Sequence, residues 1–129
     1  MSEPDNDVVK ISAAELQSVA ERLFVNAGVP IDEARLVAAS LVESNLCGHE
    51  SHGVVRVMEY LDCLSRGELQ TGVELTVVSR TSSVIVCDAH FGFGQVQMRR
   101  VIDLVEPMAR EQGIACATVR RCSPGSMTF

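Results

Sequence analysis

The sequence contains few aromatic residues and an excess of acidic over basic ones. Its 129 residues include no tryptophan, one tyrosine and four phenylalanines, which leaves little aromatic surface for stacking nucleic-acid bases or sugars. Eleven Lys and Arg against 17 Asp and Glu give a net charge of −6, which disfavours nonspecific binding to nucleic acid or anionic membranes. A helical DNA-binding domain is a poor interpretation, because the chain also lacks a basic recognition helix. A small anionic ligand is still permitted, since it responds to the local field.

The chain also lacks long apolar runs and paired cysteines. No run of apolar residues is long enough to predict a transmembrane helix, and residues 1–7 are acidic and polar, unlike a signal peptide. The five cysteines form no CxxC pair and no zinc-type cluster, so we expect no metal site. Their odd number fits a reducing compartment, and we expect a cytoplasmic protein. Cys63, Cys87 and Cys116 fall at apolar positions of expected elements, where we expect them to be buried.

Three helices are predicted in the first half of the chain. Ser12 and Glu15 have the spacing of a capping box, and the helix that they begin ends at Gly28. A second helix follows from Pro30 and ends at Gly48. A third is expected from about Gly53 to Arg66. Their predicted inward faces repeat at helical spacing: Leu16, Val19, Ala20, Leu23, Phe24 and Ala27; Ala34, Val37, Ala38, Leu41 and Val42; and Val54, Val57, Met58, Leu61 and Leu64.

The second half changes to a strand-rich pattern. The stretches 74–79 and 83–88 are rich in β-formers and predict a hairpin. A helix is expected over 95–112, with Val101, Leu104, Val105, Met108 and Ala109 on one face, and Pro107 should kink it. A short strand over 114–119 completes a strand–helix–strand unit with a parallel crossover. This strand lies at a sheet edge, or it lacks neighbours that would follow it.

The expected fold class is therefore α/β (α+β), with a three-helix cluster followed by a hairpin and the strand–helix–strand unit. We expect one domain over residues 11–119, a disordered tail over 1–10 and an irregular tail over 120–129.

The stretch from Gly48 to Val54 places two imidazoles, a carboxylate and a hydroxyl in one short loop between helices. His49 and His52 are two of the three histidines in the chain. Histidine is suited to proton transfer near neutral pH. Arg56 follows His52 by four residues and is expected to share a helix face with it. His52, Ser51 and Arg56 could therefore receive a carboxylate beside a carbonyl group.

Each of these residues also has a purely structural interpretation. Ser51 could be the N-cap of the third helix, with His52 exposed in its first turn. Arg56 could be a solvated residue paired with Glu59 or Glu50. His49 is better explained as a supporting residue than as a second catalyst. The run from His90 to Gly94 is glycine-rich but lacks the spacing of known phosphate loops, so we interpret it as a tight strand-to-helix connection.

Several of these segments together resemble a known family. The sequence Asn45-Leu-Cys-Gly-His-Glu-Ser-His-Gly-Val-Val-Arg-Val57, followed by Tyr60-Leu61, Gly67-Glu-Leu69, Gly92-Phe-Gly-Gln95 and Gly113-Ile-Ala115, is similar to the type 2 malate/L-lactate dehydrogenases. That family includes ureidoglycolate dehydrogenase, diketogulonate reductase and a piperideine-carboxylate reductase. The resemblance runs from about residue 11 to residue 119.

The resemblance implies an NAD- or NADP-dependent oxidoreductase of 2-hydroxy or 2-oxo acids, built as a homodimer on a fold that is not the classical Rossmann domain. By the same resemblance, His52 would act in acid–base catalysis. Ser51 and Arg56 would approach the substrate, and His49 would support them. No residue is assigned to cofactor binding.

Two departures from the family pattern lead to a second hypothesis. Family members are more than twice as long, and after the last strand they carry a loop with a second functional histidine, where this chain has Pro124. We therefore expect a truncated form of the fold that lacks much of the cofactor-binding surface, and the sequence leaves open whether this chain is active or inactive alone. The alternative hypothesis is a non-catalytic remnant, or a pairing module that associates with a longer homologous subunit.

Overall fold

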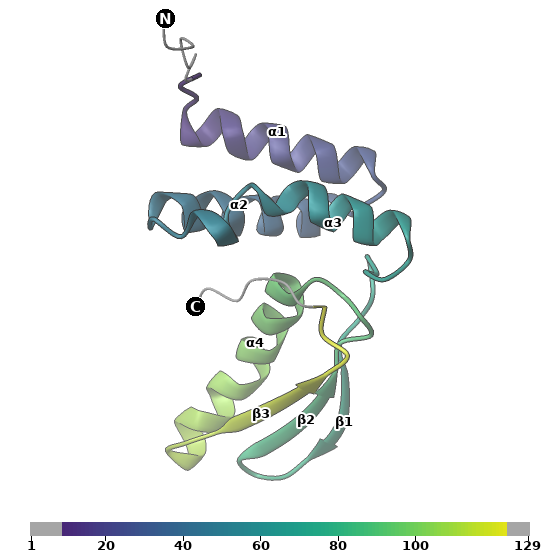
Figure 1. The fold of residues 1–129 in the computed structure, drawn as a ribbon. Helices are drawn as coiled ribbons and strands as arrows, with labels where there is room; N and C mark the ends of the chain where they lie inside the picture. Colours follow the sequence, from purple (N-terminus) through teal and green to yellow (C-terminus); the bar gives the residue numbers. More distant parts are fainter. Residues whose placement is uncertain (1–8, 124–129) are drawn as a thin grey trace, which may run out of the picture.

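The structure, a computed structural model, describes residues 9–123. They form two layers (Figure 1). Helices α1 (Ala13–Asn26), α2 (Ile31–Leu46) and α3 (Arg56–Ser65) run back and forth in one layer. In the other layer, helix α4 (Gly94–Gln112) packs on a sheet of strands β1 (Thr76–Arg80), β2 (Val84–Asp88) and β3 (Cys116–Arg120). A short 3-10 helix, η1 (Glu50–His52), lies between α2 and α3.

The helix boundaries follow the capping signals of the sequence. The side-chain oxygen of Ser12 accepts a hydrogen bond from the Glu15 N–H, and the Glu15 carboxylate accepts one from the Ser12 N–H, which confirms the capping box. Gly28 has a φ of +92°, so the chain turns after α1 in a conformation that other residues rarely adopt. Pro30 is the N-cap of α2.

The predicted core of α2 is confirmed, whereas the cores of α1 and α3 are narrower than expected. All five predicted residues of α2 are buried, but α1 buries only Ala20 and Phe24. Val19 and Leu23 are exposed, because α1 packs against α2 along one narrow stripe and lies at the outside of the layer (Figure 1). Met58 was also predicted to face inward and is 70% exposed, since α3 directs Val57 and Tyr60 into the core.

The sheet confirms the predicted hairpin and parallel connection. β2 is the central strand, antiparallel to β1 and parallel to β3. β3 therefore lies at an edge within the part of the chain that the structure describes. α4 covers one face of the sheet, where its residues Val101 and Met108 pack with Ile85 and Cys87 of β2. The helix continues through Pro107, which is exposed. Cys116 was predicted to be buried, but β3 turns its side chain to the uncovered face, where it is exposed.

An aromatic cluster and a buried carboxylate are among the contacts that join the layers. The Phe93 ring, at the start of α4, meets the rings of Phe24 and Tyr60 with centroid separations of 5.8 and 5.7 Å. The buried Glu33 carboxylate of α2 accepts hydrogen bonds from the Thr71 hydroxyl and the Gly72 N–H, each at 3.1 Å. The connection to the sheet is therefore held directly against α2.

Two sequence predictions concern the chain ends. Most of the expected tails over 1–10 and 120–129, Pro124 included, lies outside the described residues. β3 extends to Arg120, one residue beyond the predicted end of the domain. Within residues 9–123, no helix combines the length and apolar character needed to cross a membrane.

Candidate functional site

The loop from Gly48 to Val54 is held to the last turn of α2 at both of its ends. At its start, the His49 N–H donates to the Ser44 carbonyl oxygen at 2.8 Å. At its end, the Val54 N–H donates to the side-chain oxygen of Asn45, also at 2.8 Å. Gly48 has a φ of +79°, which lets the chain reverse directly after α2. The predicted substrate-binding residue Ser51 and the predicted catalytic residue His52 lie between these attachments.

Ser51 and His52 form the central hydrogen bond of the loop. The Ser51 hydroxyl and Nδ1 of the His52 imidazole are 2.9 Å apart. Both residues belong to η1, and His52 is only half-buried, so its ring is accessible from solvent. The alternative interpretation of Ser51 as N-cap of the third helix is wrong, because α3 begins only at Arg56 and Val55 takes the N-cap position. Residues 53–55, which the sequence assigned to the start of the third helix, instead form a turn that follows the 3-10 helix.

Arg56 lies beside this pair but already has two partners. Its Nε donates to the Ser51 carbonyl oxygen at 2.8 Å. Its Nη1 pairs with the carboxylate of Glu59, which raises the pKa of the Arg56 guanidinium. Glu59, rather than Glu50, is the acidic partner. A substrate carboxylate would therefore compete with Glu59 for the guanidinium.

His49 contacts the loop through its backbone. Its N–H is bonded to α2, and its carbonyl oxygen accepts from the His52 N–H at 2.9 Å. The side chain itself is exposed. The structure therefore brings the four predicted residues together, with His49 in a backbone role.

The glycine-rich run from His90 to Gly94 connects β2 to α4, as the sequence predicted. Gly92 and Gly94 are buried. A side chain on Gly92 would collide with Gln97, Val73 and the backbone of Ala89. Because protein atoms fill the space around this turn, it offers no open cradle for a phosphate group.

A cluster of charged residues at the end of the sheet was missed by the sequence interpretation. The carboxylate of Asp88, 1% exposed, accepts hydrogen bonds from Nε of Arg120 at 2.8 Å and from Nη2 of Arg121 at 2.6 Å. The Arg121 hydrogen bonds hold the pKa of the Asp88 carboxyl well below its usual range, although burial opposes this shift. The parallel crossover could have revealed this cluster, because it predicts that the carboxyl ends of the two strands meet at one sheet edge.

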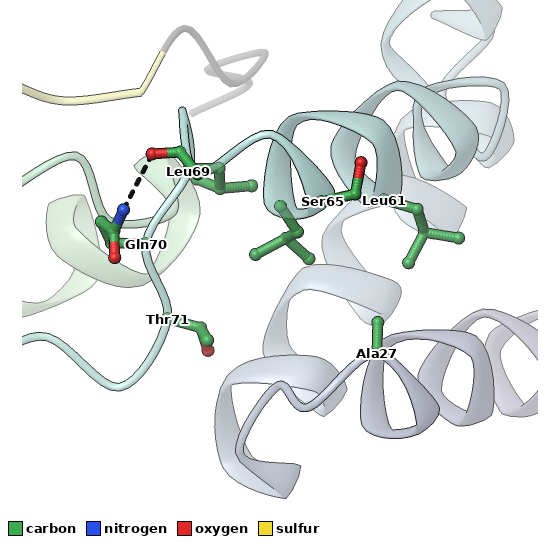
Figure 2. Close-up of a pocket in the computed structure, with 8 residues that line it drawn as sticks. Ala27, Leu61, Ser65, Leu69, Gln70 and Thr71 are labelled. Atoms are coloured by element: carbon green, nitrogen blue, oxygen red, sulfur yellow. Dashed lines mark hydrogen bonds between the residues drawn. The ribbon is translucent and has the colours of Figure 1, made fainter.

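A surface cleft lies at the other end of α3 from His52. It has a volume of about 390 Å³ and lies between the end of α1, the last turns of α3 and residues 67–71. Figure 2 shows Leu61 and Ser65 on its helical side and Thr71 on the opposite side. The Gln70 side chain donates to the Gly67 carbonyl oxygen at 2.9 Å, which braces the rim. Within residues 9–123, no group of three or more His, Cys, Asp or Glu side chains is arranged to hold a metal ion.

Comparison with known proteins decides the family. The model of the malate/L-lactate dehydrogenase family matches residues 11–127 of this chain. The chain belongs to this family. Its members are NAD(P)-dependent dehydrogenases. The resemblance inferred from the sequence motifs is therefore confirmed.

Individual relatives support this assignment, and the share of each relative that the chain covers shows how much of their length it matches. Malate dehydrogenase of Pyrococcus abyssi is 33% identical over 116 residues, which cover 90% of this chain and 32% of that protein. Hydroxycarboxylate dehydrogenase B of Escherichia coli O157:H7 is 31% identical, over 85% of this chain and 30% of the relative. The structure of malate dehydrogenase from Pyrococcus horikoshii superposes with a TM-score of 0.89 at 28% identity, covering 98% of this chain and 36% of that one. The chain thus spans about a third of the length of these relatives.

Proposed function

We propose that this chain carries the proton-transfer and carboxylate-binding residues of a dehydrogenase acting on small 2-hydroxy or 2-oxo acids. The observation that supports the proposal is the Ser51–His52 hydrogen bond beside Arg56, in a loop pinned to α2 at both ends. Family membership supplies the reaction class.

His52 is the proposed acid–base group. Its Nδ1 is in hydrogen-bond contact with the Ser51 hydroxyl, and a protonated imidazole can donate from Nδ1 to the Ser51 oxygen. In the reductive direction, the imidazolium of His52 would give a proton to the carbonyl oxygen at C2 of a 2-oxo acid and become neutral.

Arg56 is the proposed carboxylate-binding residue. A guanidinium can hold a carboxylate through two parallel hydrogen bonds. In the structure its Nε is fixed by the Ser51 carbonyl oxygen, and the Glu59 carboxylate occupies Nη1. Glu59 therefore acts as a stand-in that the substrate carboxylate displaces.

Two features of the described residues, the glycine-rich turn and the cations at the sheet edge, offer no open site for the phosphates of NAD or NADP. The glycine-rich turn at the start of α4 is filled by Gln97 and Val73. The cations at the sheet edge are engaged by Asp88. We therefore assign no cofactor contact to residues 9–123, and the proposal is limited to proton transfer and carboxylate binding.

Titration of the full chain with oxamate, an unreactive mimic of a 2-oxo acid, tests the proposal. We expect the backbone NMR signals of residues 51–56 to shift saturably. Arg56→Gln should weaken binding by about tenfold or more, because a charge-assisted hydrogen bond contributes about 1.5–3 kcal/mol. Glu59→Gln should strengthen it, by removing the competing carboxylate. Unchanged signals at residues 51–56 on saturation with oxamate would refute the carboxylate site.

A pairing module is the second candidate function. It is favoured by apolar side chains that flank the candidate loop: Leu46, Val55 and Met58 are 73%, 65% and 70% exposed. Such a group of exposed apolar residues is typical of a surface that contacts another protein. Co-purification of this chain with a longer homologous subunit, without oxamate binding, would favour this alternative.

A further inference from the structure

The side chain of Asn45 links the end of helix α2 to the candidate loop. It lies in the last turn of α2, half-buried, and its side-chain oxygen reaches across to the Val54 N–H at 2.8 Å. This hydrogen bond spans nine residues and joins the far end of the candidate loop to the helix that precedes it.

Gly53 shows how closely the loop approaches this side chain. Gly53 is buried, and a Cβ atom built on it would overlap the side-chain amide of Asn45. The backbone immediately after His52 therefore lies directly against Asn45. Glycine is needed here because a side chain would not fit beside Asn45. Backbone conformation is not the reason, since other residues also adopt the φ of −92° found at Gly53.

We propose that Asn45 is a positioning residue for His52. This inference rests on the proposed function, in which His52 transfers the proton. The Val54 N–H, two residues after His52, is fixed by Asn45, and the His52 N–H is fixed by the His49 carbonyl oxygen. Because the backbone is tied on both sides of His52, the imidazole leaves the chain in a set direction toward Ser51 and solvent.

The Val54 N–H needs a hydrogen-bond acceptor, and Asn45 supplies it through its side-chain oxygen and not through its amide nitrogen. Asn45→Asp keeps an oxygen at the same reach, while placing a negative charge at the C-terminal end of α2, where it is mildly unfavourable. Asn45→Leu keeps a similar size and leaves the Val54 N–H without its acceptor. The two variants therefore separate the positioning effect from a change in overall stability.

Backbone relaxation measured by NMR on the full chain, with no ligand present, tests this proposal. We expect order parameters near about 0.85 for Ser51 and His52 in the wild type and in Asn45→Asp, and below about 0.6 in Asn45→Leu, with α2 and α3 unchanged. Asn26→Leu, at the exposed end of α1, is the matched control and should leave the loop rigid. A rigid loop in folded Asn45→Leu would overturn the proposal.

Hydrogen exchange in the wild-type chain provides a test that does not depend on a variant folding. The Val54 amide should exchange at least about fivefold more slowly than the amides of the exposed residues Glu50 and Ser51, as expected for one net hydrogen bond. Equal rates would overturn the proposal. Both measurements omit substrate, so they are independent of oxamate binding, whose failure would instead count against the proposed function.

Discussion

Replacing Phe93 by alanine removes the ring that joins the two layers of the molecule. Phe93 is 2% exposed and lies at the N-cap of α4, while its edge-on partners, Phe24 and Tyr60, belong to α1 and α3. The ring is thus part of the helical core, although the chain around it belongs to the sheet layer.

The loss of stability expected for Phe93→Ala is large compared with the free energy of unfolding of the whole domain. Truncation of a buried phenylalanine to alanine costs about 3–5 kcal/mol, because apolar contacts are lost and a cavity remains. A domain of this size is stable by about 5–15 kcal/mol, so Phe93→Ala should remove a substantial part of its free energy of unfolding.

Phe91 provides a matched control in the same connection. Its ring is 47% exposed, and its described partner is the Arg121 guanidinium at 5.7 Å from the ring centroid. An exposed cation–π contact of this kind contributes about 0.5–1 kcal/mol. Phe91→Ala should therefore cost about 1 kcal/mol or less.

Urea unfolding followed by two probes would measure these effects. The chain has one tyrosine and no tryptophan, so intrinsic fluorescence reports on Tyr60 and hence on the helical core, while circular dichroism reports on all helices. We expect a large fall in the unfolding midpoint for Phe93→Ala and a small one for Phe91→Ala. Equal losses for the two variants would refute the argument that Phe93 joins the layers.

Two further predictions concern a helix cap and a buried charge. Ser12→Ala should destabilise the chain by about 1 kcal/mol, because it breaks the capping box; Ser18→Ala, at an exposed position within the same helix, should be neutral or slightly stabilising in the same urea assay, and equal losses would contradict the cap's role. For Asp88, the pKa is lower in the folded chain than the value of about 3.9 expected when unfolded, so its contribution to stability is present above about pH 4 and is lost as the pH falls through the folded pKa. The stability difference between wild type and Asp88→Asn should therefore shrink on acidification from pH 5 toward pH 2, and a constant difference would show that the Asp88 charge is not the cause.

Much of the secondary structure could be predicted because its signals are local. The capping contacts of Ser12 and Glu15 are three residues apart. The apolar spacing of α2 likewise lies within one continuous segment. Such patterns act through the nearest turns of the chain, so the residues themselves suffice to predict them. The strand pairing was also predicted, because two β-rich runs separated by a short polar turn favour a hairpin.

The candidate site was only partly predictable. The two histidines, Ser51 and Arg56 are close in sequence, and motif resemblance indicated their roles. The sequence did not indicate that a 3-10 helix would precede the third helix or that this helix would begin only at Arg56, and it did not distinguish Glu59 from Glu50 as the partner of Arg56. The path of the loop follows its close approach to Asn45 at Gly53, which depends on available space and not on helix propensity.

Local patterns in the sequence therefore predicted the order of helices and strands and the group of residues that carry the proposed chemistry, and its motifs indicated the family. Which apolar residues are buried depends on packing, since Met58 and Cys116 satisfy the helical and strand patterns yet face outward. The tertiary structure also decided that Asp88 is bound by Arg120 and Arg121, more than 30 residues away in the chain. Contacts of this kind depend on how the elements pack around one another, and no short-range pattern in the chain encodes that packing.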